Sequence, residues 1–161
     1  MIEVLVEDDG WRTVLPSAAA LAKAAARAVL KAEALSMRTG LCLLLTSDAR
    51  QQALNTQFRG KPATTNVLSF PAPEGTRGHL GDVSLALGVC AREASGQGKP
   101  LAAHLQHLTA HGVLHLLGYD HQTSADADSM EAKERAILAQ LGVPDPYAER
   151  GDQGDHGQHG Q

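Results

Sequence analysis

The chain of 161 residues has the length of one domain, with 43% hydrophobic and 20% charged residues and a formal net charge of −4. The negative charge argues against a protein that is basic throughout, and the lack of any run of about 18 apolar residues excludes a membrane-spanning helix. Aromatic residues make up only 3%, so Leu, Val and Ala must form most of the core.

Two features indicate a reducing, cytoplasmic environment. The first residues, MIEVLVEDDG, lack the basic segment and long apolar segment of a secretory signal peptide. Cys42 and Cys90 lie far apart in apolar surroundings without a CxxC pairing, which favours buried free thiols over a disulfide. We therefore expect a cytoplasmic protein.

The N-terminal part of the chain alternates strand and helix patterns. Residues 2–6 (IEVLV) predict a short strand, and Ser17 is a candidate N-cap for an amphipathic helix that runs to about residue 35. The apolar run CLLLT (42–46) is short enough for a buried strand, and a second helix is expected at 48–58 after Ser47 or Asp48. Because a strand–helix–strand order favours a parallel pair, these two strands should be parallel.

The rest of the chain adds two strands and two long helices. A loop at 59–65 (RGKPATT) precedes a third strand at 66–70, and a turn-rich connector leads to a fourth strand at 81–87, which can pair antiparallel with the third. The Gly-rich residues 95–100 precede a strong helix at about 101–117. A last helix is expected from a cap near Ser124 to Gly142.

These patterns predict an α+β fold: a single domain in which a mixed sheet of about four strands packs with about five helices, with a metal site at the end of a central helix. The domain should cover residues 1–147. The tail, residues 148–161, is polar and Gly-rich and is expected to be disordered, and its two histidines could bind metal only loosely.

The segment HGVLHLLGYDH (111–121) has the spacing of a three-histidine metal site. His111 and His115 lie four residues apart on the predicted helix, so both imidazoles project from the same face. Gly118 can end the helix with a positive φ, after which His121 can supply a third nitrogen. A histidine pair at this spacing often arises by chance, but three histidines with the glycine in register rarely do.

Three protein ligands leave the fourth tetrahedral position open to water, as in catalytic zinc sites, where the metal lowers the pKa of that water to about 7. His107 lies on the same helical face and could approach the metal. It is better explained as a hydrogen-bond partner or core residue, because a fourth protein ligand would close the open position. Asp120 could orient a ligand imidazole or stabilise the turn.

The same spacing occurs in the zinc-protease signature H-E-x-x-H-x-x-G-x-x-H, but here Gly112 stands at the position of the general-base Glu. Peptide hydrolysis would lose the help of that base, typically worth about 10²–10⁴-fold. A scissile phosphodiester instead needs cations for its anionic transition state, which a metal ion and a positioned Arg supply. Residues 50–99 have a local net charge of +3 and could contact a polyanion, although charge alone favours a solvated face.

Three blocks of the sequence resemble the YbeY family of bacterial zinc-dependent endoribonucleases. HGVLHLLGYDH is similar to the family signature H-G-x-L-H-L-x-G-Y-D-H, LNTQFRGKPATTNVLSFP (54–71) to L-N-x-x-F-R-x-x-x-x-x-T-D-V-L-S-F-P, and LGDVSLA (80–86) to an L-G-D-[IV] strand. The order and approximate spacing of the blocks also fit, as does the closing MEAKERAILAQLGVPDPY. The resemblance runs from about Val4 to Tyr147.

The resemblance implies a metal-dependent endoribonuclease that cuts single-stranded RNA, with one Zn²⁺ per chain held by His111, His115 and His121. It also implies a catalytic role for Arg59, a part in 16S ribosomal RNA 3′-end maturation and ribosome quality control, and the small ribosomal subunit as a partner, with no DNA or membrane. One departure is Asn66, which stands where the family pattern has Asp. If that Asp only braces the loop, Asn can replace it; if its charge matters, activity or metal handling changes.

Two other functions remain open from the sequence. The chain could be a metalloprotease or amidase that recruits a base such as Asp120 or Glu131. It could also be a non-enzymatic ribosome-binding protein with structural zinc, in which protein atoms, for instance from His107, fill all four positions. His₃ sites also accept nickel, copper or iron. In an RNase, the nucleophile would be metal-activated water or a substrate 2′-hydroxyl, and only the latter leaves a cyclic phosphate.

Overall fold

A four-stranded mixed sheet with the order β1-β2-β4-β3 lies at the centre of the computed structural model, which describes residues 1–148. Strands β1 (Ile2–Val6), β2 (Gly40–Thr46) and β4 (His79–Ala86) are parallel, and β3 (Val67–Pro71) pairs antiparallel with β4. The predicted mixed sheet is therefore confirmed, strand by strand. The predicted disordered tail lies, from residue 149 onward, outside the described residues.

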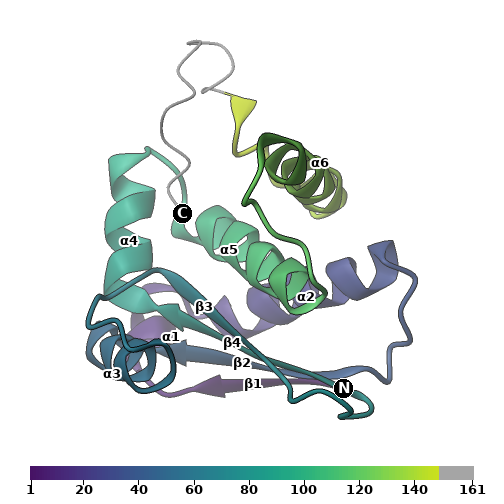
Figure 1. Cartoon of the computed structure of the whole chain (residues 1–161). Helices are drawn as coiled ribbons and strands as arrows, with labels where there is room; N and C mark the ends of the chain where they lie inside the picture. The colour runs from purple at the N-terminus through teal and green to yellow at the C-terminus, as the bar shows by residue number, and fades with distance from the viewer. Residues whose placement is uncertain (149–161) are drawn as a thin grey trace.

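The described residues form six helices: α1 (Gly10–Val14), α2 (Ala18–Ala32), α3 (Asp48–Arg59), α4 (Leu87–Gly96), α5 (Leu101–Leu116) and α6 (Ser124–Gln140). Four of them match the predicted helices to within a few residues. Figure 1 shows α2 and α5 on one side of the sheet, with α6 beyond them. Within residues 1–148, no helix combines the length and the apolar character needed to cross a bilayer.

The sequence reading did not predict α1 and α4. Helix α4 starts at Leu87, directly after β4 ends at Ala86, so the apolar run of the strand continues into the helix without a loop. Its buried residues, Cys90 and Ala94, are four apart, which is the helical spacing. Helix α1 is a short helix that places the fully buried Trp11 at the end of the sheet, where its Nε1 donates to the Thr46 carbonyl at 3.0 Å.

Of the three predicted helix caps, two form and one lacks its side-chain hydrogen bond. The Ser47 hydroxyl accepts a hydrogen bond from the Arg50 amide at 3.1 Å and caps α3 as expected. Helix α6 is capped near Ser124, as expected: the Thr123 hydroxyl accepts a hydrogen bond from the Asp126 amide at 3.0 Å. Ser17 stands at the N-cap of α2 but its side chain makes no capping hydrogen bond, because its backbone is not extended there (φ −90°, ψ 10°).

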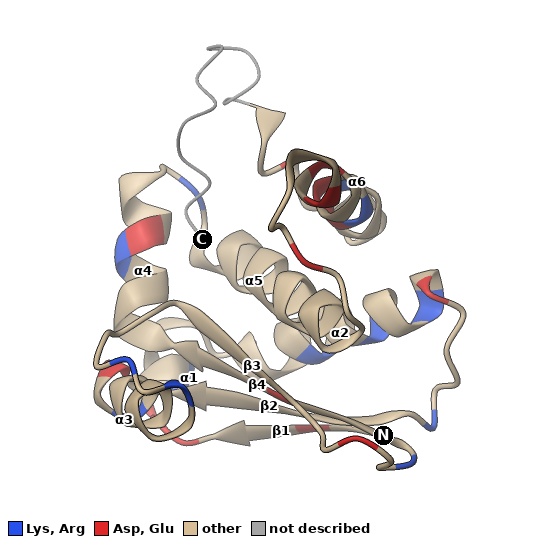
Figure 2. Cartoon of the chain, in the orientation of Figure 1, with Lys and Arg blue, Asp and Glu red and all other residues tan. Residues whose placement is uncertain are grey.

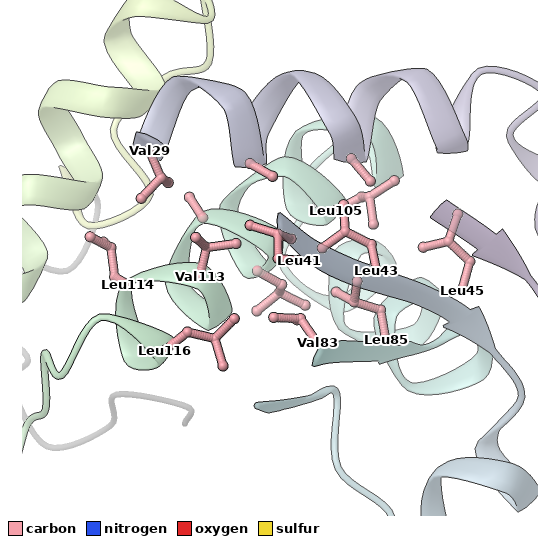
Figure 3. Packing of buried hydrophobic residues seen from close by; sticks show 14 of the residues in the cluster. Val29, Leu41, Leu43, Leu45, Val83, Leu85, Leu105, Val113, Leu114 and Leu116 are labelled. Carbon is pink, nitrogen blue, oxygen red and sulfur yellow. The ribbon is translucent and has the colours of Figure 1, made fainter. Parts of the chain in front are cut away.

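The core lies between the sheet and helices α2 and α5 and is almost entirely aliphatic. Figure 3 shows Leu41, Leu43 and Leu45 of β2 facing Val29 of α2 and Leu105 of α5. Each fully buried Leu contributes about 1.5–3 kcal/mol relative to an exposed one, so this layer supplies much of the stability. Trp11 is the one aromatic residue among the buried hydrophobic residues of the described chain, as the composition predicted.

Helix α3 lies on the opposite face of the sheet from α2 and α5 (Figure 1). Its fully buried Gln51 accepts a hydrogen bond from the Ser84 hydroxyl at 2.7 Å and donates to the Ser84 carbonyl at 3.1 Å. The neighbouring Val83 and Leu85 point the other way, into the core with α5, as strand alternation requires. The sheet therefore separates α3, which ends at Arg59, from α5, which carries the histidines.

Gly112 allows α5 to approach β3 and β4 at a distance that no other residue permits. A Cβ at this position would lie 2.6 Å from Val83 Cγ1 and 3.2 Å from Val67 Cγ2 and Ser69 Oγ. The Ser69 hydroxyl donates to the Gly112 carbonyl at 2.8 Å, which ties the helix to the strand. Position 112 therefore faces the sheet, and a side chain there would be directed at Val83.

Asn66 braces the start of β3 against α4 and α5. Its Oδ1 accepts from the Val67 amide at 2.6 Å, and its Nδ2 donates to Glu93 Oε1 at 3.0 Å, which also bonds His104 Nε2 at 2.9 Å. Burial raises the pKa of Glu93, but the hydrogen bonds from His104 and Asn66 outweigh it, so the pKa of Glu93 is lowered. The amide thus supports an ionised Glu93, which an Asp at position 66 would repel.

We expect Gly112→Ala to lower the free energy of unfolding by up to about 2 kcal/mol, because the clash with Val83 costs about 1–3 kcal/mol and the higher helix propensity of Ala returns only about 1 kcal/mol. Gly96→Ala is the matched control, since a Cβ there meets nothing within 4 Å. Urea unfolding of both variants measures the difference. A Gly112→Ala protein as stable as the control would show that the close approach is not needed.

We expect Asn66→Asp to destabilise the fold by about 1–2 kcal/mol at pH 7, through a lost charge-assisted hydrogen bond and repulsion of Glu93. The pKa of Glu93 is lowered in the folded parent protein. Ionised Glu93 therefore stabilises the parent at pH values above the ordinary pKa of a Glu, and this contribution is lost as the pH falls. Repulsion in the variant also needs both carboxylates ionised, so the destabilisation should shrink towards pH 4. Urea unfolding at both pH values, with Asn66→Ala as the uncharged control, tests this; a loss independent of pH would contradict it.

Candidate metal centre

Helix α5 is an uncharged, largely buried helix that presents a row of histidines to α6. It contains no Lys, Arg, Asp or Glu, and Figure 2 shows it without charged residues beside the charged α6. His107, His111 and His115 follow one another at intervals of four and are half-buried, whereas Leu105, Val113 and Leu114 are buried in the core. Core packing on one side of α5 thus fixes the direction of the histidines on the other.

A Schellman turn ends α5 and brings His121 back to the end of the helix. Gly118 has φ +100°; its amide donates to the His115 carbonyl at 3.0 Å, and the Tyr119 amide donates to the Leu114 carbonyl at 3.1 Å. The Tyr119 hydroxyl anchors the turn to Glu33, just after α2, at 2.7 Å. The predicted role of Gly118 as a helix terminator is therefore confirmed.

Asp120 stabilises this turn: its Oδ1 accepts from the His121 amide at 2.7 Å. Of the two alternatives left open for Asp120, the contact favours the turn-stabilising one. Glu131, the other base considered for a protease, lies on α6 and pairs with Arg135 at 3.7 Å.

The ring nitrogens of His111, His115 and His121 converge, with one atom from each lying within 4.8 Å of the others. The Nε2 atoms of His111 and His115 are 3.1 Å apart, close to the roughly 3.3 Å separation of two nitrogens bound at about 2.0–2.1 Å to one tetrahedral ion. No other cluster of three or more potential metal ligands occurs within residues 1–148. His107 is not a member, because its Nε2 points to Glu134.

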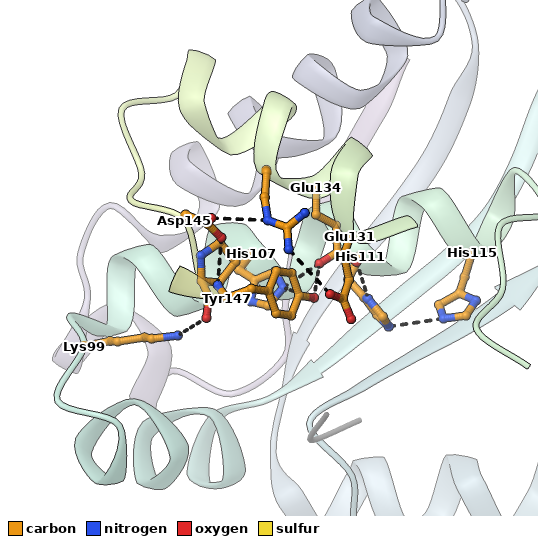
Figure 4. A network of polar contacts seen from close by, with 10 residues as sticks. Lys99, His107, His111, His115, Glu131, Glu134, Asp145 and Tyr147 are labelled. Carbon is orange, nitrogen blue, oxygen red and sulfur yellow. Dashed lines mark hydrogen bonds and ion pairs between the residues drawn. The ribbon is translucent and has the colours of Figure 1, made fainter. Parts of the chain in front are cut away.

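Glu134 of α6 is a buried carboxylate that contacts the histidine cluster through His111. Figure 4 shows His107, His111 and Tyr147 directed at it, with His111 continuing to His115. Oε2 of Glu134 bonds His111 Nδ1 at 2.7 Å, and Oε1 bonds His107 Nε2 at 2.7 Å and accepts from the Tyr147 hydroxyl. The Glu134 side chain is 1% exposed. The expectation that His107 acts as a hydrogen-bond partner fits this network.

The ionisation of these groups suits metal binding at neutral pH. Burial raises the pKa of Glu134, but the hydrogen bonds and charges of His107 and His111 outweigh it and lower that pKa well below its usual range. Burial, followed by the proximity of His111 and His121, lowers the pKa of His115 to about 4. Burial also lowers the pKa of His107. His115 is therefore a neutral imidazole at pH 7, the form that binds metals.

Arg59 lies outside the histidine cluster, at the C-terminal end of α3. Its Nη2 donates to the Ser69 carbonyl at 3.0 Å, and the hydroxyl of the same Ser69 bonds the Gly112 carbonyl, next to His111. Strand β3, at the edge of the sheet, therefore links Arg59 to the helix that carries the histidines. Arg59 itself makes no contact with the three imidazoles among the described interactions.

Three cations of the basic segment 50–99 have partners within the protein. Arg50 pairs with Glu7 at 3.9 Å, Arg92 pairs with Asp48 at 3.0 Å, and Lys99 Nζ bonds the Pro146 carbonyl at 3.4 Å. Figure 2 shows positive charge at α3 and the loop that follows it. Arg59 and Lys61 lie at the end of α3 and in the loop that follows it.

Sequence reasoning missed Glu134 and Tyr147. A detectable signal was present, because Met130, Ile137 and Leu138 place Glu134 on the apolar face of α6, where a carboxylate needs partners. Tyr147 follows the helix in an irregular segment and offered no periodic signal. The donor set itself fits a zinc-like ion: three imidazole nitrogens, one of them backed by a carboxylate.

Comparison with known proteins identifies the family. The family model described as "Endoribonuclease YbeY" matches residues 7–142. Proteins named "Endoribonuclease YbeY" from Azorhizobium caulinodans and Rhodopseudomonas palustris are 50% and 46% identical, over 91% of this chain and 96% and 80% of theirs. One from Jannaschia is 57% identical over 66% of this chain and 75% of its own.

The fold also matches a solved structure. The solution structure of TM1509 from Thermotoga maritima has a TM-score of 0.63, with 24% identity over 100% of this chain and 99% of that chain, and supports the fold alone. The family model, in contrast, spans β2, β3 and β4, the histidine cluster and all of α6. The chain therefore belongs to the YbeY endoribonuclease family.

Proposed function

We propose that the protein is a zinc-dependent endoribonuclease that cuts single-stranded RNA. One Zn²⁺ would be held by His111, His115 and His121, and Arg59 would contact the scissile phosphate. The observation that carries the proposal is the convergence of three ring nitrogens within 4.8 Å in a member of an endoribonuclease family. When bound, the ion supplies Lewis acidity and lowers the pKa of water at its open position.

The residues of this chain supply the remaining requirements of phosphodiester cleavage. Arg59 uses one guanidinium nitrogen on the Ser69 carbonyl, and its planar fork suits two phosphate oxygens. A cation at that place would stabilise the charge that develops on the phosphate. The low pKa of His115 keeps its nitrogen unprotonated for the metal at neutral pH.

Two features argue against the protease alternative. Position 112, which holds the general base in zinc proteases, faces Val83 of the sheet in this chain. Asp120 and Glu131, the other bases considered, are engaged with the His121 amide and with Arg135. The structural-zinc alternative needs a fourth ligand, and the Nε2 atom of His107 is directed to Glu134 instead.

The biological setting is inferred from the family resemblance. We expect the substrate to be ribosomal RNA, with the enzyme acting in 16S 3′-end maturation and ribosome quality control on the small ribosomal subunit. The expected location is the cytoplasm, with no action on DNA or membranes. Free thiols at the buried Cys90 and half-buried Cys42 are compatible with that compartment.

We expect His115→Ala to abolish metal-dependent cleavage, because two remaining imidazoles bind Zn²⁺ weakly. The assay compares structured and unstructured RNA with Zn²⁺ present and after chelation, and analyses the product ends. Chelation should inactivate the parent, and unstructured RNA should be cut preferentially. His79→Ala, an exposed histidine outside the cluster, is the control. Full cleavage by His115→Ala, or by the chelated parent, would refute the proposal.

We expect Arg59→Lys to reduce RNA cleavage by about 10–100-fold, because a charge-assisted bidentate contact contributes about 1.5–3 kcal/mol and Lys cannot reproduce its geometry. Zinc content, measured by elemental analysis, should be unchanged. Arg50→Lys makes the same change elsewhere on α3, where Arg50 faces Glu7, and should retain activity. Wild-type cleavage by Arg59→Lys would remove Arg59 from the mechanism.

A further inference from the structure

The environment of Glu134 restricts what this side chain can do. Three donors converge on its carboxylate: His111 Nδ1 on Oε2, and His107 Nε2 and the Tyr147 hydroxyl on Oε1. An ionised carboxylate only accepts hydrogen bonds, so it satisfies all three donors, which an amide or a hydroxyl could not do. With its side chain 1% exposed, Glu134 is inaccessible to a substrate from solvent.

The hydrogen bond to Glu134 determines which nitrogen of His111 carries the proton. Because the carboxylate can only accept, Nδ1 must donate, and Nε2 keeps its lone pair. That Nε2 is the atom 3.1 Å from His115 Nε2, on the side of the cluster. Rotation of the ring would break the Nδ1 contact, so the same bond fixes the orientation of the ring.

Glu134 is itself held by residues outside the cluster. His107 lies one turn before His111 on α5, and Tyr147 comes from the segment after α6. That segment is tied back at two points: Asp145 pairs with Arg135 at 3.2 Å, and the Pro146 carbonyl accepts from Lys99 at 3.4 Å. Figure 4 shows these contacts as one connected network that ends at His115.

We propose that Glu134 is the positioning residue of the metal centre: held by His107 and Tyr147, it keeps His111 protonated at Nδ1 with Nε2 directed at the ion. The proposal rests on the proposed function, because it assigns a role toward the metal that the three histidines would bind. The segment after α6 thereby becomes part of the metal centre, although it contributes no ligand.

The first test is the affinity of the metal-free protein for Zn²⁺ alone, measured by competition with a chromophoric chelator. Glu134→Gln should bind Zn²⁺ about 10–100-fold more weakly, the usual effect of losing such a partner. The matched control is Glu93→Gln, which removes a carboxylate from a histidine of the same helix, His104 at 2.9 Å, without touching the cluster. Tyr147→Phe removes only one donor to Glu134 and should cause a smaller loss.

The second test starts with the parent protein, whose result does not depend on any variant folding. Nitrogen-15 NMR of the metal-free chain should show His111 protonated at Nδ1 and unprotonated at Nε2, and Glu134→Gln should show a mixture of tautomers. An Nε2-protonated His111 in the parent, or equal Zn²⁺ affinity of folded Glu134→Gln and Glu93→Gln, would overturn the proposal. Failure of the proposed function gives a different result: the parent would not cut RNA, while the tautomer measurement would still decide the role of Glu134.

Discussion

The contact between α5 and the sheet at Gly112 is the constraint on which the rest of the site depends. With no side chain there, the helix lies directly on Val83 and Ser69, and Ser69 bonds the Gly112 carbonyl. The apolar residues of α5 are buried against this surface, which fixes the rotation of the helix about its axis. His111 and His115 therefore point to one place, and a side chain at position 112 would clash with Val83.

On the opposite side of α5, hydrogen bonds to the Glu134 carboxylate, rather than apolar packing, hold the side chains in place. A buried Glu normally destabilises a fold, but here three donors meet it and keep it ionised. The network joins α5, α6 and the segment after α6, which are distant in sequence. The network holds the ring of His111 through Glu134, whereas His121 lies on an exposed turn outside it.

Strand β3 connects the two chemical elements of the proposed enzyme. The Ser69 carbonyl accepts from Arg59 and the Ser69 hydroxyl donates to Gly112, so one residue contacts both the helix that bears the arginine and the helix that bears the histidines. Asn66, at the start of the same strand, is bound to Glu93 and the Val67 amide. Asn66, which stands where the family pattern has Asp, therefore has hydrogen-bond partners within this chain.

The sequence predicted the strands because short apolar runs were bounded by turn residues, and it predicted the long helices from their periodicity. The sequence did not predict the junction between β4 and α4, because no polar loop separates them. It did not predict α1, because a helix of five residues shows too little periodicity. The histidine spacing predicted a shared helical face, since i and i+4 positions coincide in any α-helix.

By itself, then, the sequence determined the order of the four strands and the four long helices, the family and the spacing of the three histidines, because local periodicity and fixed spacing encode them. Only the tertiary structure decided that Gly112 faces the sheet, that His107 turns away from the cluster, and that Glu134 and Tyr147 stand behind His111. These facts depend on how separate elements pack, and packing brings together residues such as His111 and Glu134 whose relation has no signature in local sequence.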